Sequence, residues 1–222
     1  MLESPPKLDA VELLAAQRQS LSSPRRRYAV AARLLFLLMD LLYGRQRSLA
    51  KFKVLEIVAR VPYQAWEQVA YITLTHRYNR LHFARRVFER VNESRSQQDN
   101  EQWHLLIIQE LLDDRDEPDT LIRHRLVPQV IAFFYYQLSV LLFIVRPKWS
   151  YRLNADFEDH AEHEYALFVD ESEWLTERAY DGIFGEDYGR FNTLADLFRQ
   201  IGHDERVHKL ESLERMGEPR FS

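Results

Sequence analysis

The sequence predicts an all-helical protein, and three observations favour that fold class. Glycine and proline are scarce, at 6 and 8 of 222 residues, whereas sheet proteins need many turns. Alternating apolar and polar residues separated by glycine-rich turns, the pattern of strands, do not occur. Leucine, arginine, glutamate and alanine, which favour helices, are plentiful. The length suits one substantial core, so a single domain is expected.

The first helices follow from composition and from proline placement. Residues 1–24 are expected to form a flexible leader with a short helix at about 9–18. The segment YAVAARLLFLLMDLLY, residues 28–43, predicts an apolar helix, and three consecutive arginines precede it. A further helix is expected over 48–76, with a kink at Pro62 because proline removes a backbone hydrogen bond.

The rest of the chain continues the same helical pattern. We expect one helical domain over residues 25–216 and a short tail over 217–222. Within that domain the remaining elements are a helix inside 83–112, a break at DDRDEPD (113–119), an apolar helix at 126–145, a helix at 150–177, a loop at 182–189 and a last helix at 193–215.

The apolar segment 126–145 meets the length criterion for a membrane span, because its 20 residues carry no charge. It nevertheless contains a proline and several polar side chains, and the other apolar segment, 28–43, carries Arg33 and Asp40. Basic clusters lie beside both segments. Two helices lying in the membrane interface fit this pattern better than two spans. Two buried core helices fit the pattern about equally well.

Charge is unevenly distributed although the net charge is only -4. Residues 20–60 contain nine lysines and arginines against two acidic residues, whereas residues 154–187 contain twelve acidic residues against one arginine. Nucleic acid is one partner that the basic part could bind. An anionic membrane surface is the better interpretation, because long apolar helices accompany the basic residues.

Two motifs, each a glutamate followed three residues later by a histidine, suggest metal chemistry. Glu101 precedes His104, and Glu205 precedes His208. Residues three apart project from one face of a helix, so a carboxylate and an imidazole can reach the same metal pair. A carboxylate-bridged di-iron site in a four-helix bundle uses two such motifs and one glutamate from each of the other two helices.

The two single glutamates of such a site are also present. Glu56 lies in the apolar segment VLEIVA and Glu158 lies in FEDHAEHEY, and each interval between the four positions accommodates a helix and a connection. The chain has no cysteine, so any metal must be held by carboxylates and imidazoles, which suit iron or manganese. Tyr165 follows Glu158 by two helical turns and should point toward the same centre.

The residues alone also allow a helical bundle without a metal site. A single glutamate–histidine pair at this spacing is more often a solvated pair than a pair of ligands. The buried glutamates could also pair with arginines such as Arg60 and Arg206 in a metal-free helical bundle.

Four stretches in order carry a resemblance to a known family. They are FKVLEIVARVPY (52–63), NEQWHLLIIQEL (100–111), IAFFYYQLSVLLFIVRPKWSYRLNADFEDHAEHEY (131–165) and IGHDERVHK (201–209). Together they resemble the alternative oxidases, and more specifically the plastid terminal oxidase branch of that family. The resemblance covers about residues 40–210.

The resemblance implies a ferritin-like four-helix bundle with two additional apolar helices that dock on the membrane surface without spanning it. It also implies a centre of two iron ions, a tyrosine with a redox role, Tyr165, and two residues, Asn100 and Asp204, that hold ligands by hydrogen bonds. The implied iron ligands are Glu56, Glu101, His104, Glu158, Glu205 and His208.

The sequence departs from the family pattern near the implied quinol site. Lys51 stands where the family has an arginine that contacts quinol, and it lacks the planar guanidinium. Leu55 and Ala161 match quinol-lining positions, while Asp40 and Arg47 match only after a one-residue shift. Away from that site, Trp103, Ile57 and Val207 also differ from the family's residues.

The resemblance implies a quinol oxidase that reduces O2 to water without pumping protons, with plastoquinol or ubiquinol as the electron donor. The start of the chain shows no targeting signal, so we expect a protein on the cytoplasmic side of a thylakoid or plasma membrane in a photosynthetic prokaryote. Nucleic acid is not an expected partner, and a homodimer stays open. Two rival interpretations are a soluble ferritin-like di-iron oxygenase or iron-binding protein, and a metal-free helical scaffold at a membrane surface.

Overall fold

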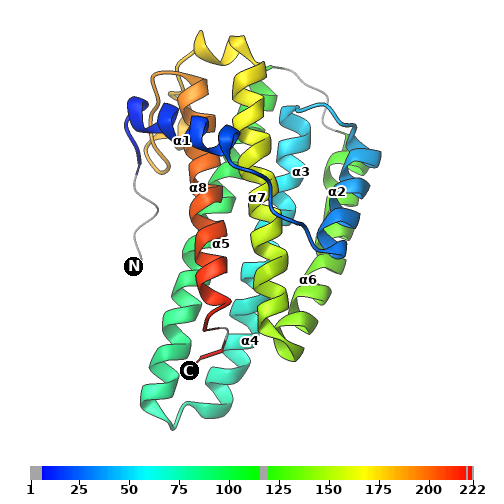
Figure 1. The fold of residues 1–222 in the computed structure, drawn as a ribbon, viewed down its shortest axis with the longest axis vertical. Coiled ribbons are helices and arrows are strands. Elements are labelled where there is room, and N and C mark those ends of the chain that lie inside the picture. Colours follow the sequence, from blue (N-terminus) through cyan, green and yellow to red (C-terminus); the bar gives the residue numbers. More distant parts are fainter. Residues whose placement is uncertain (1–6, 116–119, 219, 222) are drawn as a thin grey trace.

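The fold was analysed in a computed structural model, which describes residues 7–115, 120–218 and 220–221. The described residues form α-helices and short helical turns, and no strand occurs among them, which confirms the all-helical prediction. Figure 1 shows long, roughly antiparallel helices that pack side by side. The elements are α1 (Ala10–Ser22), α2 (Val30–Tyr43), α3 (Leu49–Ala59), α4 (Val61–Arg77), α5 (Leu81–Asp114), α6 (Val127–Val145), α7 (Pro147–Glu171) and α8 (Leu194–Arg215).

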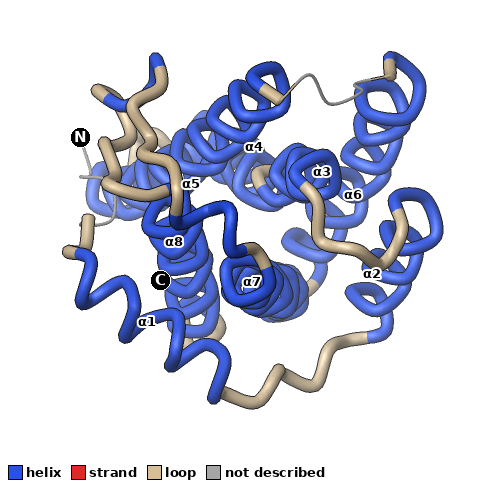
Figure 2. Tube along the Cα trace, turned by 90° about the horizontal axis from the view of Figure 1, so that it is seen from above, coloured by secondary structure: helices blue, strands red, loops and turns tan. Residues whose placement is uncertain are grey.

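A four-helix bundle forms the centre of the molecule. Helices α3, α5, α7 and α8 contribute its four walls, and Figure 2 shows them grouped around a common interior when the bundle is viewed from above. Helices α2 and α6 lie on one outer side of this bundle, and α1 crosses α7 and α8 on another (Figure 1).

The helix predicted over 48–76 is two helices in the structure. Helix α3 ends at Ala59, α4 begins at Val61, and Arg60 between them keeps helical backbone angles. Pro62 lies in the first turn of α4, where its missing N–H removes no necessary hydrogen bond. The single helix predicted with a kink at Pro62 is therefore two helices, and the boundary between them falls two residues before the proline.

The other long helices differ from the predictions mainly at their ends. Helix α5 runs without interruption from Leu81 to Asp114, although its middle is polar, because that part faces polar partners inside the bundle. The helix predicted over 150–177 begins earlier, at Pro147, and ends at Glu171, before a 3-10 turn over Glu173–Thr176. The break predicted over 113–119 falls partly outside the described residues.

Two further segments contain more structure than their patterns predicted. One turn of π-helix, Leu121–Leu126, precedes α6, and a 3-10 turn, Ile183–Gly185, lies inside the loop predicted over 182–189. Thr193 caps α8, and its side chain accepts a hydrogen bond from the backbone N–H of Asp196.

Much of the predicted flexible leader packs against the bundle. A capping box at Asp9 and Glu12 starts α1. Gln17 and Ser20 are buried, because Gln17 donates to the carbonyl of Ala166 (3.0 Å) and Ser20 donates to a carboxylate on α7. These contacts hold α1 in place, whereas residues 1–6 lie outside the described residues.

Candidate metal centre

Six side chains from four helices converge in the interior of the bundle. One comes from α3, two from α5, one from α7 and two from α8, and none is more than 1% exposed. The helical spacing predicted from the two glutamate–histidine motifs explains why each pair faces inward from one helix. The six residues are Glu56, Glu101, His104, Glu158, Glu205 and His208.

The six residues form two overlapping groups, each able to surround one metal ion. Glu56 and His104 belong to one group, and Glu158 and His208 belong to the other; Glu101 and Glu205 belong to both. Within each group the candidate ligand atoms lie within 4.8 Å of one another. Two ions bridged by two shared carboxylates would satisfy this arrangement.

Atoms of this cluster lack hydrogen-bond partners, which is unusual for buried polar groups. Both carboxylate oxygens of Glu101 and of Glu205, and Nδ1 of His104, make no hydrogen bond. The ligand atoms also lie very close, with His208 Nδ1 2.7 Å from Glu101 Oε1 and His104 Nδ1 3.2 Å from Glu205 Oε1. Buried ligand atoms that face one another without hydrogen-bond partners are what a site for two cations requires.

The electrostatics of the cluster also favour bound cations. Burial raises the pKa of Glu101 and Glu205 well above the ordinary glutamate value, and repulsion between neighbouring carboxylates raises both further. Burial likewise raises the pKa of Glu158. Divalent cations would remove this penalty and keep the carboxylates ionised.

The alternative in which arginines neutralise the glutamates is wrong for the two arginines considered. Arg60 Nη1 donates to the side chain of Gln102, on the outer side of α5. Arg206 Nε donates to Glu162 (2.9 Å), which is not one of the four glutamates of the cluster.

Asp204 connects several residues behind His104. Its Oδ2 atom accepts hydrogen bonds from Asn100 Nδ2 (3.1 Å) and Tyr188 Oη (2.8 Å) and lies 3.3 Å from His104 Nε2. Its other oxygen accepts from Gln200 Nε2 (2.7 Å). This arrangement orients the imidazole so that Nδ1 faces the metal positions. That Asn100 and Asp204 hold ligands, as the family resemblance implies, stays a prediction; in the structure they are hydrogen-bonded to each other behind His104.

The charge of Asp204 follows from its neighbours. Burial alone would raise the pKa of this carboxyl group, but the hydrogen bond with His104 and the charge of Lys7 hold it well below the ordinary range. Sequence reasoning missed Tyr188, Gln200 and Lys7. Gln200 could have been found, because it precedes Asp204 by one helical turn, whereas Tyr188 lies in a loop whose position no helical spacing predicts.

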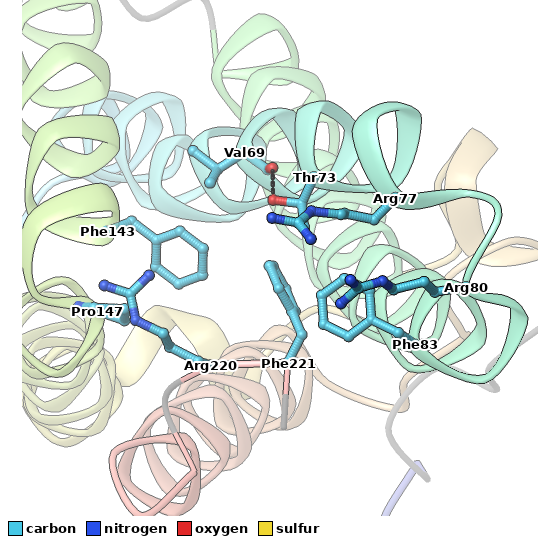
Figure 3. Close-up of a pocket in the computed structure, with 9 residues that line it drawn as sticks. All are labelled: Val69, Thr73, Arg77, Arg80, Phe83, Phe143, Pro147, Arg220 and Phe221. Carbon is cyan, nitrogen blue, oxygen red and sulfur yellow. Dashed lines mark hydrogen bonds between the residues drawn. The ribbon is translucent and has the colours of Figure 1, made fainter.

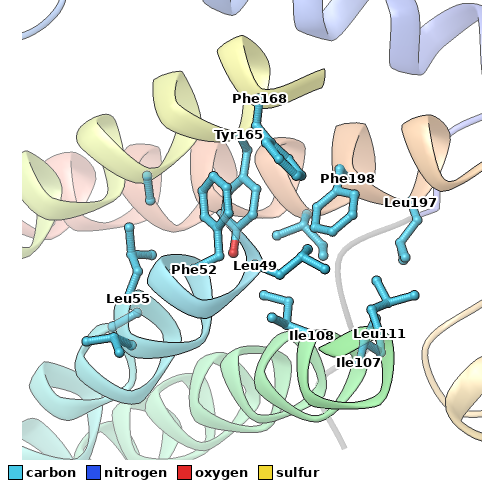
Figure 4. Close-up of a cluster of buried hydrophobic side chains, with 14 of the residues drawn as sticks. Leu49, Phe52, Leu55, Ile107, Ile108, Leu111, Tyr165, Phe168, Leu197 and Phe198 are labelled. Carbon is cyan, nitrogen blue, oxygen red and sulfur yellow. The ribbon is translucent and has the colours of Figure 1, made fainter. Parts of the chain in front are cut away.

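Tyr165 lies against the cluster at Glu56. It is fully buried, and its hydroxyl donates a hydrogen bond to Glu56. Figure 4 shows its ring among the aromatic side chains of the core. Phe52 stacks on it with ring centroids 4.3 Å apart, and Phe198 stacks at 6.1 Å. Burial raises the pKa of Tyr165 well above 10, and nearby Glu56 raises it further.

Another tyrosine that was not predicted, Tyr63, also contacts the cluster. Tyr63 Oη donates to Glu158 Oε1 (2.6 Å) and accepts from Asn154 Nδ2 (2.9 Å). Its spacing offered a signal, since Tyr63 follows Glu56 by seven residues, as Tyr165 follows Glu158. Tyr165, on α7, contacts Glu56 of α3, and Tyr63, on α4, contacts Glu158 of α7.

A third group of acidic and histidine side chains lies outside this centre. Asp159, Glu162 and His163 on α7 place candidate ligand atoms within 4.8 Å of one another. Lys209 Nζ already lies between the two carboxylates, 3.1 Å from Asp159 Oδ1 and hydrogen-bonded to Glu162. An ammonium group therefore supplies the positive charge at this place, and the group is an internal ion-pair network.

The residues predicted to line a quinol site are only partly brought together. Lys51 Nζ donates to Asp40 Oδ1 (2.6 Å) and to the carbonyl of Gly44 (3.0 Å). Leu55 is buried in the core, as is Ala161.

Arg47 pairs with acidic residues of α7 and takes no part in the ion pair between Lys51 and Asp40. Its Nε atom lies 3.1 Å from Glu164 Oε2, and Nη1 lies 2.9 Å from Glu171 Oε1. Trp103, whose role the sequence left open, lies at the edge of the core, where its ring contacts Phe184 at 6.0 Å between centroids.

Four buried glutamates and two histidines on a four-helix bundle define a carboxylate-bridged dinuclear metal protein. The alternative oxidase family model matches residues 7–213, so the chain belongs to the alternative oxidase family. Alternative oxidases are di-iron proteins, and the six residues fit that cofactor.

A curated relative extends this comparison. The chain is 36% identical over 133 residues to Ubiquinol oxidase 4, chloroplastic/chromoplastic, from Arabidopsis thaliana. The match covers 60% of this chain but 34% of the relative, so it extends over about a third of the relative's length.

Proposed function

We propose that this protein is a di-iron quinol oxidase that docks on a membrane surface and reduces O2 to water with electrons from plastoquinol or ubiquinol. The observation that carries the proposal is the pair of overlapping carboxylate–histidine groups in the interior of an alternative oxidase bundle. The name of the Arabidopsis relative supports quinol as the electron donor.

The six buried residues would hold the two irons, and Glu101 and Glu205 belong to both ligand groups. Iron bound there would supply electron transfer and a binding place for oxygen. Asn100 and Asp204 act through hydrogen bonds that fix His104. Core side chains surround these six residues, none of which is more than 1% exposed, and so keep bulk water out of the site.

Two tyrosines are placed to assist the reaction. Tyr165 donates a hydrogen bond to Glu56 and is shielded by stacked aromatic rings. It therefore holds a phenolic proton, and an oxidisable ring, beside the metal positions. We propose that Tyr165 supplies an electron and a proton during oxygen reduction. Tyr63 holds Glu158 in position from the other side.

The outer surfaces of α2 and α6 support membrane docking. Each helix buries one face against the bundle, through Phe36 and Met39 on α2 and Ile131 and Phe143 on α6. The opposite faces expose large apolar side chains to the surroundings. These are Val30, Leu34, Leu37 and Leu41 on α2, and Val130, Phe133, Phe134, Leu141 and Ile144 on α6.

The dimensions of these helices favour docking over spanning. Segment Leu121–Val145 is the one helix among the described residues that is long and apolar enough to cross a membrane, with 28% of its apolar window buried. Helix α2, its partner, has 14 residues and is about 21 Å long, shorter than the roughly 30 Å of a bilayer's hydrocarbon core. We propose that both helices lie in one leaflet, which leaves no path for proton pumping.

A groove between the two docking helices offers an entrance for quinol. Its volume is about 280 Å³, and its walls are almost entirely apolar. We propose that quinol enters here and that Lys51, held by Asp40, binds a polar oxygen of the head group. The groove lining consists of Ala31, Leu35, Leu38, Val130, Ile131, Phe134, Tyr135, Leu138 and Leu153.

Oxygen uptake by iron-loaded, detergent-purified protein tests the proposal. Plastoquinol and ubiquinol analogues should each be offered, and the faster donor identifies the preferred quinone. Uptake should depend on quinol and should disappear in Glu158→Ala. Iron-loaded protein that consumes no oxygen with either quinol, or a Glu158→Ala variant with full activity, contradicts it. Recovery of the whole protein in the soluble fraction without detergent would favour a soluble di-iron protein instead.

A further inference from the structure

We propose that a pocket beside the α4–α5 turn binds one anionic phospholipid of the bilayer, with its phosphate on Arg77 and Arg80 and an acyl chain along the aromatic wall. The inference rests on the proposed membrane docking and adds a specific lipid site to it. The site is separate from the metal centre and from the groove between α2 and α6.

The pocket has the size and lining of a small-molecule site. Its volume is about 470 Å³, within the range of roughly 300–1,000 Å³ found for ligand pockets. Figure 3 shows aromatic side chains on its inner side and arginines around them. The lining residues are Val69, Thr73, Arg77, Arg80, Phe83, Phe143, Pro147, Arg220 and Phe221.

The aromatic wall of the pocket is fixed by contacts from several elements. Phe221 lies edge-on to Phe83, with centroids 6.5 Å apart, and its centroid is 6.3 Å from that of Phe143. Arg86 Nε donates to the carbonyl of Phe221 (3.4 Å), and Arg220 Nη2 donates to the carbonyl of Ile144 (3.1 Å). The wall is therefore preformed, which lowers the entropic cost of placing an acyl chain against it.

The two proposed phosphate ligands have no acidic partner among the described residues. Neither Arg77 nor Arg80 forms an ion pair within that part of the chain, whereas the nearby Arg85, on α5, pairs with Glu89 (3.3 Å). Figure 3 shows the side chain of Arg80 beside Phe83 and that of Arg77 beside Thr73. Two guanidinium groups beside an apolar pocket suit a phosphate attached to a hydrocarbon chain.

The pocket is continuous with the proposed docking surface. Phe143 is buried in the pocket wall, and the next two residues of α6, Ile144 and Val145, are 53% and 62% exposed. Trp149, which is also exposed, lies under Arg146 at 4.8 Å from ring centroid to guanidinium carbon. An aromatic ring and an arginine at the end of an apolar helix are typical of the level of lipid head groups. A bilayer phospholipid therefore fits the site better than free phosphate.

Vesicle flotation of the iron-loaded full-length protein tests the proposal. Vesicles of phosphatidylcholine alone are compared with an equimolar mixture of phosphatidylcholine and phosphatidylglycerol. The test variant is Arg77→Gln/Arg80→Gln, and the charge-matched control is Arg18→Gln/Arg85→Gln, whose arginines lie outside the pocket. A third variant, Val69→Phe, fills the pocket without changing charge. Circular dichroism checks that each variant is folded.

We expect the wild-type protein to bind the phosphatidylglycerol vesicles more tightly than the neutral ones. Arg77→Gln/Arg80→Gln should weaken that binding by about fivefold for each arginine, while the control double variant loses much less. Val69→Phe should also weaken it. Equal losses in both double variants, or full competition by inorganic phosphate, would overturn the proposal while leaving docking intact. If the wild-type protein binds neither vesicle, membrane docking itself is refuted.

Discussion

Removing the ammonium group of Lys209 tests how the interior between α7 and α8 is held together. In Lys209→Met, Asp159 and Glu162 lose the cation that lies between them, and both carboxylates are at most 2% exposed. Removing one partner of a buried ion pair typically lowers the free energy of unfolding by about 3–5 kcal/mol. Because Glu162 keeps hydrogen bonds from Arg206 and Ser20, we expect the lower end, about 3 kcal/mol.

Thermal unfolding of metal-free protein, followed by circular dichroism, measures this loss. A change of about 3 kcal/mol corresponds to a fall in Tm of roughly 6–12 °C for a chain of this size. Lys148→Met, at an exposed position on α7, is the control and should change Tm by far less. Adding Glu162→Gln to Lys209→Met should restore part of the stability, because it removes one of the unpaired buried charges.

The same variant carries a pH prediction. Burial alone would raise the pKa of Glu162, but Lys209, Ser20 and Arg206 hold it below the ordinary value of 4.5. A lowered folded-state pKa contributes stability above the unfolded value and loses it as pH falls through the folded value. The difference in free energy of unfolding between wild type and Lys209→Met should therefore be largest near neutral pH and should shrink below about pH 4.5. The reasoning would be refuted if this difference in free energy stayed constant down to strongly acid pH, or if Lys209→Met were as stable as wild type at neutral pH.

Three further predictions follow from the metal centre and its surroundings. Glu101→Gln alters a residue shared by both groups and should remove both irons, whereas Glu158→Gln alters only one group and should leave more iron bound. Mass spectrometry measures the iron content of each variant, and equal content in the two would count against shared ligation. Gly202→Ala places a Cβ 3.3 Å from Cβ of Tyr165, and this crowding should outweigh the roughly 1 kcal/mol by which a helix favours alanine over glycine, so the denaturant midpoint should fall; an unchanged or raised midpoint would contradict the reasoning. Lys51→Met should raise the KM for quinol while leaving iron content unchanged, and an unaltered KM would remove Lys51 from the proposed quinol site.

The candidate ligands could be picked out of the sequence because their spacing depends on local helix geometry. The spacing of Glu101 and His104 places both side chains on one face of any helix, whatever the tertiary structure. Glu56 stood out for a different reason, since a charged residue inside an apolar segment needs a compensating partner. The pairing of these helices across the bundle followed from the family resemblance, because local spacing carries no information about it.

The missed residues depend on tertiary contacts that sequence spacing does not encode. Tyr188 reaches Asp204 from a loop, and Lys209 is directed between two carboxylates of a neighbouring helix. The boundary at Arg60 was not predicted, and one kinked helix was expected instead. Pro62 is tolerated in the first turn of a new helix, so the sequence shows the proline but not where the preceding helix ends. The packing of α1 likewise depends on partners in α7 and α8.

The central claim is tested most directly by the stoichiometry of the reaction at the iron-loaded centre. Quinol oxidation and oxygen consumption should be recorded together in liposomes, with an assay for hydrogen peroxide. Full reduction of O2 to water requires two quinols for each O2, so we predict that ratio with no peroxide, and no turnover in Glu158→Ala. Release of one peroxide for each quinol oxidised, or equal turnover by the iron-free protein, would contradict the proposed oxidase.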